Sequence, residues 1–480
     1  MHQLSIHMMS EKYSQTLTWC ACLLLSIVAS SVALPSFAQK QSEQDSARQT
    51  TGESVLPQPS SAAQKLYSVA KNDLLQIRVL VKNGRTQSSV GSGFFVDDSD
   101  LVVTNYHVVS QIALEPEVYI GEFVDTNDQR GTVELLAVDV LHDLAVVRVS
   151  RKGKGFFKIP SNANQLAPLS QGQYLYSLGN PLDLGFAISE GAYNGVIGRS
   201  FYDQFMFTGP INAGMSGGPN VNSAGALAGV NVAKRTDGEL VSFLVPARYV
   251  VDLINRVKTQ KQVPSSFSQE VGRQLLTHQN FMIDKLLENN LSSKLLGRYL
   301  VPVRESDQMR CWGSSNTKEE TAYSEDKMNC AMESSLFVSG KLQTGLVAMT
   351  HTLLQSKKLD ALRFSRLISE RFKNQIYAST RQASVTAPAC IEDFIKNEGV
   401  SMRAVVCTRA YRKFPELYDF IVISSSLDQS KEVLQSRLDV RGVSYQNGLR
   451  ATRVFLKGIS MSPITAGIAV DVNTSKGEAK

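Results

Sequence analysis

Long apolar runs and dense runs of basic residues are both missing from this sequence. Its 480 residues include 50 Lys and Arg against 44 Asp and Glu, a formal net charge of +6. Because no segment concentrates this small excess, we do not expect a nucleic-acid partner. The most apolar stretch, residues 19–34, is too short and too rich in Ser and Ala for a membrane span.

Cysteine is also scarce, with none between Cys22 and Cys311. The first half of the folded chain must therefore be stable without disulfide bonds. The sequence shows no cluster of residues with metal-ligand spacing and no glycine-rich phosphate-binding loop, so we expect no metal and no cofactor. At 43% apolar residues, the chain has enough material for globular cores and too much for a mostly disordered protein.

The apolar stretch near the N-terminus is followed by small residues at Ser36 and Ala38. This spacing is typical of a signal-peptidase site, and we expect cleavage after Ala38. Residues 1–38 would then be a signal peptide, and the mature protein would be periplasmic or secreted. The positive charge of Lys12 is nearly balanced by Glu11, so an uncleaved N-terminal anchor is the alternative.

Four cysteines remain after removal of the signal peptide: Cys311, Cys330, Cys390 and Cys407. An even number in an exported chain favours disulfides, for which sequence alone allows three pairings. We expect Cys311–Cys330 and Cys390–Cys407, because short loops close at the lowest entropic cost. Four reduced, buried thiols are the alternative.

The length suggests two or three domains. Residues 39–63 are rich in Gln, Ser, Thr and Pro and are expected to be a flexible leader. Residues 64–262 contain many short β-type runs separated by turn residues, which predicts an all-β barrel or sandwich, with an amphipathic helix at its end. Residues 263–480 mix helices with strands and predict an α+β region. A weak similarity between its two cysteine-containing stretches suggests related halves, with chance similarity as the alternative.

Ser216 stands in a glycine-rich segment, after Gly214 and before Gly217 and Gly218. A serine that cleaves peptides needs a base, an anion to orient the base, and N–H donors for the oxyanion. Glycine lets a chain turn so that successive N–H groups point into one cavity. We expect Ser216 to be the nucleophile and the N–H groups of Gly214 and Ser216 to be the oxyanion donors. A surface turn is the alternative.

The base and the orienting acid come from two other segments. His107 lies at the end of a predicted strand, where a rigid element can aim it into a cleft. Asp143 begins a strongly apolar strand, so its carboxylate needs a partner such as an imidazole N–H. Asp139 is the rival for this role, and His142 is interpreted as a neighbour on the solvent side.

These segments resemble the trypsin-like peptidases of the HtrA/Deg type. The matching segments are GSGFFVDDSDLVVTNYHVV, DVLHDLAVVRV, YSLGNP, EGAYNGVIG, INAGMSGGPNVNSAGALAGVNVA and SFLVPARYV, which together cover about residues 65–260. The resemblance implies the double β-barrel chymotrypsin fold. It implies His107 as general base, Asp143 as orienting acid, Ser216 as nucleophile, and an oxyanion hole from Gly214 and Ser216.

The resemblance also implies the substrate-binding residues. The strand edge that pairs with substrate backbone would consist of Asn231, Val232, Ala233 and Lys234, and the base of the primary pocket would contain Pro210 and Ile211. No acidic residue stands in this pocket, which favours a small or medium apolar residue before the scissile bond. The chain departs from the family at Met215, where Asn is usual, and residues 265–480 do not resemble a PDZ module.

We therefore expect an exported serine endopeptidase that acts on protein or peptide substrates through an acyl-enzyme. No stable membrane span is expected after signal cleavage, and the oligomeric state is not readable from the sequence. There are two alternatives. The chain could be a pseudoenzyme that binds peptides without cutting them, or its main function could belong to the C-terminal region as a partner-binding module.

Overall fold

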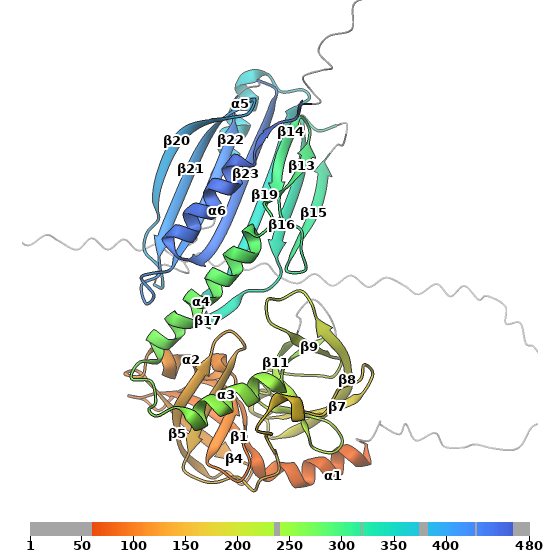
Figure 1. Ribbon diagram of the computed structural model, residues 1–480, viewed down its shortest axis with the longest axis vertical. Coiled ribbons are helices and arrows are strands. Elements are labelled where there is room, and N and C mark those ends of the chain that lie inside the picture. Colours follow the sequence, from red (N-terminus) through yellow and green to blue (C-terminus); the bar gives the residue numbers. More distant parts are fainter. Residues whose placement is uncertain are drawn as a thin grey trace, which may run out of the picture. The chain divides into compact units, whose positions relative to one another are not determined.

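A computed structural model describes residues 60–234, 241–316, 318, 320–373, 383–427 and 430–463 (Figure 1). The expected signal peptide and its cleavage site lie outside these residues, as does nearly all of the expected leader. None of the helices within the described ranges is both long enough and apolar enough to cross a membrane.

The N-terminal half folds into two closed six-stranded antiparallel barrels. In spatial order, the first barrel contains β1 (Leu74–Val81), β2 (Gln87–Phe95), β3 (Leu101–Thr104), β6 (Leu144–Val149), β5 (Arg130–Asp139) and β4 (Tyr119–Asp125). The second contains β10 (Pro219–Val221), β11 (Leu227–Lys234), β12 (Ser242–Pro246), β9 (Gln204–Phe207), β8 (Ala187–Ile197) and β7 (Tyr174–Gly179). Closure leaves few open strand edges that could pair with other chains. The predicted all-β double barrel is confirmed.

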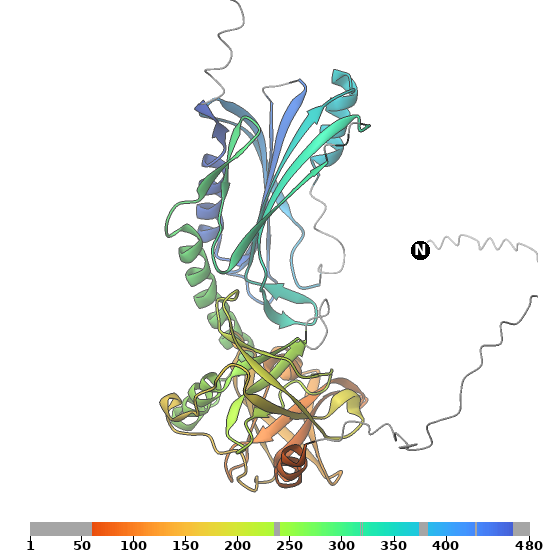
Figure 2. The ribbon, with the colours of Figure 1, turned by 90° about the vertical axis from the view of Figure 1, so that its right-hand side faces the viewer.

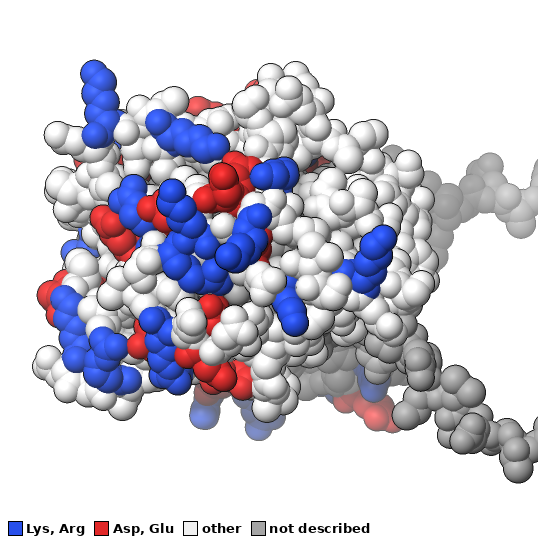
Figure 3. All heavy atoms as spheres, turned by 90° about the horizontal axis from the view of Figure 1, so that it is seen from below, with Lys and Arg blue, Asp and Glu red and all other residues white. Residues whose placement is uncertain are grey.

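In the described part of the chain, three α-helices accompany the barrels: α1 (Ser61–Ala70), α2 (Tyr106–Leu114) and α3 (Ala247–Thr259). Residues from α1 and α3 share one apolar core with strands of both barrels. On the outside of the barrels, Figure 3 shows basic and acidic side chains interspersed over the face seen from below. In the first barrel, Arg85 and Glu122 form an ion pair with an N–O distance of 3.0 Å.

The C-terminal region is built around a seven-stranded antiparallel sheet. Its spatial order is β15 (Met309–Asn316), β16 (Tyr323–Met332), β19 (Leu346–Ser356), β23 (Glu432–Val443), β22 (Tyr418–Ser426), β21 (Val400–Ala410) and β20 (Ala389–Asn397). Helices α4 (Phe267–Leu287) and α6 (Tyr445–Lys457) lie along one face of this sheet (Figure 2). This mixture confirms the predicted α+β character.

The remaining C-terminal elements are smaller. They are a three-stranded sheet of β13 (Ser292–Leu296), β14 (Tyr299–Val303) and β24 (Ser460–Met461), a hairpin of β17 (Leu336–Ser339) and β18 (Leu342–Thr344), and helix α5 (Ala361–Arg371). The hairpin and the start of α4 carry buried apolar side chains that pack with the first barrel. Val271, Leu275, Val338 and Leu342 belong to the same apolar cluster as Tyr106 and Val108.

Both expected disulfides are present in the structure. Cys311 bonds to Cys330 between β15 and β16, and Cys390 bonds to Cys407 between β20 and β21. In each case the two cysteines are directly opposite in the strand register, so pairing of the strands brings the thiols together. The two bonds reinforce the outermost strand pairs at opposite edges of the seven-stranded sheet.

Candidate active site

The three candidate catalytic residues come from both barrels. His107 is the second residue of α2, and Asp143 immediately precedes β6 of the first barrel. Ser216 lies in the loop between β9 and β10 of the second barrel. This arrangement places a base and its orienting acid on one barrel and the nucleophile on the other.

The prediction that a strand continues to His107 is wrong, because β3 ends at Thr104 and a helix begins at Tyr106. The start of this helix is capped by a residue that lies far away in the sequence. The backbone N–H of Tyr106 donates to the Asp143 carbonyl oxygen at 3.1 Å, and that of His107 donates to Asp143 Oδ1 at 2.8 Å. A carboxylate at a helix N-terminus satisfies free N–H groups and favours the helix. This tertiary cap outweighs the β propensity of Val108 and Val109.

Asp143 also fixes the imidazole of His107. The distance from Asp143 Oδ2 to His107 Nδ1 is 2.6 Å, so the carboxylate holds the tautomer in which Nδ1 carries the proton. The pKa of His107 is raised: burial alone lowers it, but the charge of Asp143 and the hydrogen bond to that carboxylate outweigh the effect of burial. In turn, Asn105 Nδ2 donates to the Asp143 carbonyl oxygen at 2.7 Å.

The hydroxyl of Ser216 has a different partner. Ser216 Oγ donates to the carbonyl oxygen of Val232 in β11 at 2.8 Å, and no hydrogen bond joins it to His107 in the described part of the chain. The structure therefore brings His107 and Asp143 together but leaves the hydroxyl turned toward β11. Hydrogen bonds of this kind are often long or unmade before substrate binds.

The loop around Ser216 requires its glycines. Gly214 has a φ of +92°, and a Cβ on it would lie 2.3 Å from the carbonyl oxygen of Asn180. The backbone N–H groups of Gly214 and Ser216 donate no hydrogen bond within the described residues, whereas those of Met215 and Gly217 are bonded. Two unused donors two residues apart in one turn are what an oxyanion hole needs.

Ser92 in β2, which sequence reasoning missed, ties this loop to the first barrel. Its N–H donates to the Ser216 carbonyl oxygen at 2.7 Å, and its Oγ donates to the Gly214 carbonyl oxygen at 2.7 Å. The same Oγ accepts from the N–H of Asn180 at 2.9 Å. Ser92 is completely buried. A buried hydroxyl that both donates and accepts a hydrogen bond holds its partners in one geometry.

The residues expected to bind substrate differ in what they contact. Asn231 is buried, and its backbone N–H and carbonyl oxygen are bonded to Gly218 and Gly217 of the nucleophile loop. Its side chain bonds to Ser177 Oγ and the Leu178 carbonyl oxygen. Asn231 therefore holds the nucleophile loop in place. The strand edge expected to pair with substrate begins at the next residue, Val232.

Two other expected pocket residues also differ from each other. Pro210 is exposed, whereas Ile211 is buried in the apolar cluster of the second barrel. The side chain of Met215 is buried in the same cluster, so it does not line the N–H donors on either side of it.

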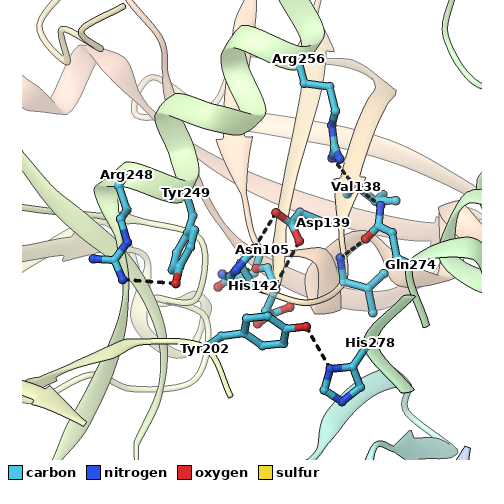
Figure 4. Close-up of polar contacts among 12 residues, drawn as sticks. Asn105, Val138, Asp139, His142, Tyr202, Arg248, Tyr249, Arg256, Gln274 and His278 are labelled. Carbon is cyan, nitrogen blue, oxygen red and sulfur yellow. Dashed lines mark hydrogen bonds and ion pairs between the residues drawn. The ribbon is translucent and has the colours of Figure 1, made fainter. Parts of the chain in front are cut away.

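Asp139 pairs with the neighbouring histidine and does not reach His107. The distance from Asp139 Oδ2 to His142 Nδ1 is 2.8 Å. The His142 ring stacks on Tyr249 at a centroid distance of 3.6 Å and meets Tyr202 edge-on at 4.8 Å (Figure 4). The interpretation of His142 as a solvent-side neighbour is therefore wrong, since two aromatic rings enclose it.

A further histidine extends this cluster. Tyr202 Oη lies 2.9 Å from Nδ1 of His278 in α4. Burial lowers the pKa of His278 to about 4, so its imidazole is neutral near pH 7 and accepts from the tyrosine hydroxyl. Among the described residues, no group of three or more His, Cys, Asp and Glu side chains could hold a metal ion.

Comparison with known proteins identifies the barrel region. Residues 91–230 match the family model described as trypsin-like peptidase domain. A probable periplasmic serine endoprotease, DegP-like, of Pseudomonas fluorescens is 29% identical over 203 residues, which are 40% of this chain and 40% of that protein. Serine protease HTRA1 of Xenopus laevis is 29% identical over 182 residues, 35% of this chain and 37% of that protein. The predicted resemblance to the HtrA/Deg type is confirmed.

Among solved structures, a serine endoprotease from Yersinia pestis is 22% identical, with a TM-score of 0.34, and the match covers 42% of this chain and 67% of that one. Deg5 is 23% identical with a TM-score of 0.35, covering 41% of this chain and 94% of that one. The chain spans less than half the length of the curated relatives it matches.

Proposed function

Starting from a trypsin-like peptidase domain at residues 91–230, we propose that this protein is a serine endopeptidase with His107, Asp143 and Ser216 as its catalytic triad. The observation that carries the proposal is the 2.6 Å contact between Asp143 and His107 Nδ1. The unused N–H groups of Gly214 and Ser216 support it. The serine protease names of the relatives agree with this class of reaction.

The reaction follows from the positions of the donors and acceptors. With Nδ1–H held by Asp143, the Nε2 lone pair of His107 accepts the proton as Ser216 Oγ attacks the peptide carbonyl carbon. The oxyanion that forms is stabilised by the N–H groups of Gly214 and Ser216. The imidazolium then protonates the leaving amine as the C–N bond breaks, which leaves an acyl-enzyme. Water, deprotonated by His107, hydrolyses the ester.

Before attack, the hydroxyl of Ser216 has to leave Val232. Rotation about the Cα–Cβ bond exchanges the 2.8 Å bond to the Val232 carbonyl oxygen for one to Nε2 of His107. One neutral hydrogen bond is worth about 1 kcal/mol net, so the exchange is inexpensive. Substrate backbone that pairs with β11 would compete for the same carbonyl oxygen and favour the rotated hydroxyl.

The proposed organisation places a signal peptide at residues 1–38, a leader at 39–63, the protease domain at 64–262 and the α+β region at 263–480. Export to the periplasm or the medium is supported by the small residues before position 39 and by the disulfides of the C-terminal region. Protein or peptide substrates are the proposed partners. The alternative is that the C-terminal region binds a partner as the main function.

The proposal is tested by labelling the mature protein with a fluorophosphonate, which reacts only with an activated serine. We expect a single adduct on Ser216 and hydrolysis of casein near neutral to mildly alkaline pH. Peptide mapping by mass spectrometry locates the adduct. A protein that binds peptides but is neither labelled nor hydrolytic would establish the pseudoenzyme alternative.

Ser92→Ala is expected to lower kcat on peptide substrates while leaving KM nearly unchanged. The substitution keeps the N–H bond to Ser216 but removes the hydroxyl from Gly214 and Asn180. Leaving such buried groups unpaired costs roughly 1–3 kcal/mol, which corresponds to about 5-fold to 160-fold in rate if the loss falls on the oxyanion hole.

The readout that separates this role from general destabilisation is a peptide boronic acid, which forms a tetrahedral adduct with the serine. Its affinity should fall by the same factor as kcat, while the acid limb of the pH profile, set by His107, stays in place. Ser88→Ala is the matched control, because Ser88 is an exposed serine on the same strand. Equal losses in the two variants would contradict the role of Ser92.

A further inference from the structure

The C-terminal region contacts the segment that carries the candidate base. The hydroxyl of Tyr106, the residue before His107, donates to the carbonyl oxygen of Val338 in β17 at 2.8 Å, and this bond is buried. Val338 and Leu342 of the β17–β18 hairpin pack in one apolar cluster with Tyr106 and Val108. Buried apolar packing combined with a buried hydrogen bond holds the hairpin against α2.

A second contact holds the segment that precedes Asp143 in the chain. Gln274 of α4 is buried against the first barrel, where its Nε2 donates to the Val138 carbonyl oxygen at 2.9 Å and its Oε1 accepts from the Val140 N–H at 2.8 Å (Figure 4). The side-chain amide thereby bonds to the backbone at the end of β5 as a neighbouring strand would. Because α4 and the hairpin both contact the base and acid segments, the C-terminal region is part of the wall around the site.

Phe337 is the residue of the hairpin that faces the histidine. The side chain of Phe337 is partly buried and packs against the same apolar cluster as Tyr106 and Val108. The Phe337 ring meets the His107 ring edge to face at a centroid distance of 6.0 Å and the Tyr106 ring at 6.3 Å. Beside it is a cavity of about 160 Å³, lined by Asp143, Val232, Tyr202 and Phe337 among others.

We propose that Phe337 is a specificity-determining residue, which limits the size of the substrate side chain that lies against His107. This inference rests on the proposed function. A substrate strand that pairs with β11 at Val232 alternates its side chains between two directions. If the side chain before the scissile bond points toward Pro210 and Ile211, the one preceding it points the opposite way. That direction leads to His107 and to the ring that the C-terminal region places there.

The experiment compares full-length wild type with Phe337→Ala and Phe337→Leu. The substrates are fluorogenic peptides built on one casein cleavage site, which differ only in the second residue before the scissile bond: Gly, Ala, Leu or Phe. We expect Phe337→Ala to raise kcat/KM for Leu and Phe relative to Ala by about 10- to 200-fold, the range that fit in an apolar pocket commonly gives. Phe337→Leu should show a smaller shift in the same direction.

Phe394→Ala is the matched control, because Phe394 lies on the outermost strand β20 and is 67% exposed. The rate of fluorophosphonate labelling gives the second readout, since the probe has no peptide side chain to meet Phe337. We expect this rate to be unchanged in Phe394→Ala, and to change in the two Phe337 variants by far less than their preference among the peptides. If Phe337→Ala fails to fold, Phe337→Leu carries the test.

Three results would overturn the inference. An unchanged preference among the four peptides would remove Phe337 from the substrate site. Faster labelling of Phe337→Ala would show that the ring blocks the serine, and loss of labelling in a folded variant would show that it positions His107. Failure of the wild type itself to be labelled would instead overturn the proposed function, and the two failures are therefore distinguishable.

Discussion

Ser216→Ala is expected to reduce turnover of protein substrates by about 10⁴- to 10⁶-fold, because the nucleophile and the acyl-enzyme route are lost together. Stability should change little, since within the described residues the hydroxyl makes a single bond, to the Val232 carbonyl oxygen. The measurement is kcat on a fluorogenic casein-derived peptide, with thermal unfolding recorded on the same samples.

Two further variants sharpen this experiment. His107→Ala combined with Ser216→Ala should cost little more than Ser216→Ala alone, because triad members act as a unit and their effects do not add. Ser223→Ala is the control, since Ser223 is exposed in the turn that follows the same loop. Wild-type turnover in Ser216→Ala would assign the nucleophile elsewhere.

Asp143→Asn is expected to reduce kcat by about 10⁴-fold, because an amide no longer selects the tautomer of His107 that accepts the serine proton. The pH profile should change as well. Asp143 raises the pKa of His107, so its replacement lets that pKa fall. Since the base acts in its neutral form, the acid limb of kcat/KM moves to lower pH. The measurement is the full profile of kcat/KM against pH.

Asp139→Asn is the matched control for this change. Asp139 contacts His142 and not His107, so its substitution should leave the acid limb in place and lower kcat far less. A larger loss in Asp139→Asn than in Asp143→Asn, together with a shifted acid limb, would transfer the orienting role to Asp139.

Much of this site could be predicted from the sequence, because its parts are local signals. The glycines around Ser216 indicate a tight turn with no room for a Cβ atom. Asp143 directly precedes an apolar strand. The disulfide pairing was also accessible, since each pair of cysteines lies on two neighbouring strands in sequence. Here short separation along the chain coincided with proximity in space.

The parts that sequence reasoning missed depend on contacts between distant residues. The helix at His107 begins where it does because Asp143, 36 residues later, accepts its N–H. Ser92 and Gly214 are 122 residues apart, and Tyr106 and Val338 are 232 apart. No local pattern encodes such partners. The double barrel itself was predictable, whereas the hydrogen bonds that hold the catalytic segments in place were not.

The apolar cluster that joins the first barrel to the hairpin and to α4 has an evolutionary consequence. A domain attached by a polar linker can be exchanged for another by recombination without loss of either fold. Here a break between residues 262 and 263 would separate Tyr106 and Val108 from Val338 and Leu342, and leave both sets facing water. Exchange of either part for an unrelated domain would therefore expose an apolar face, and substitutions on one side of the cluster constrain those accepted on the other.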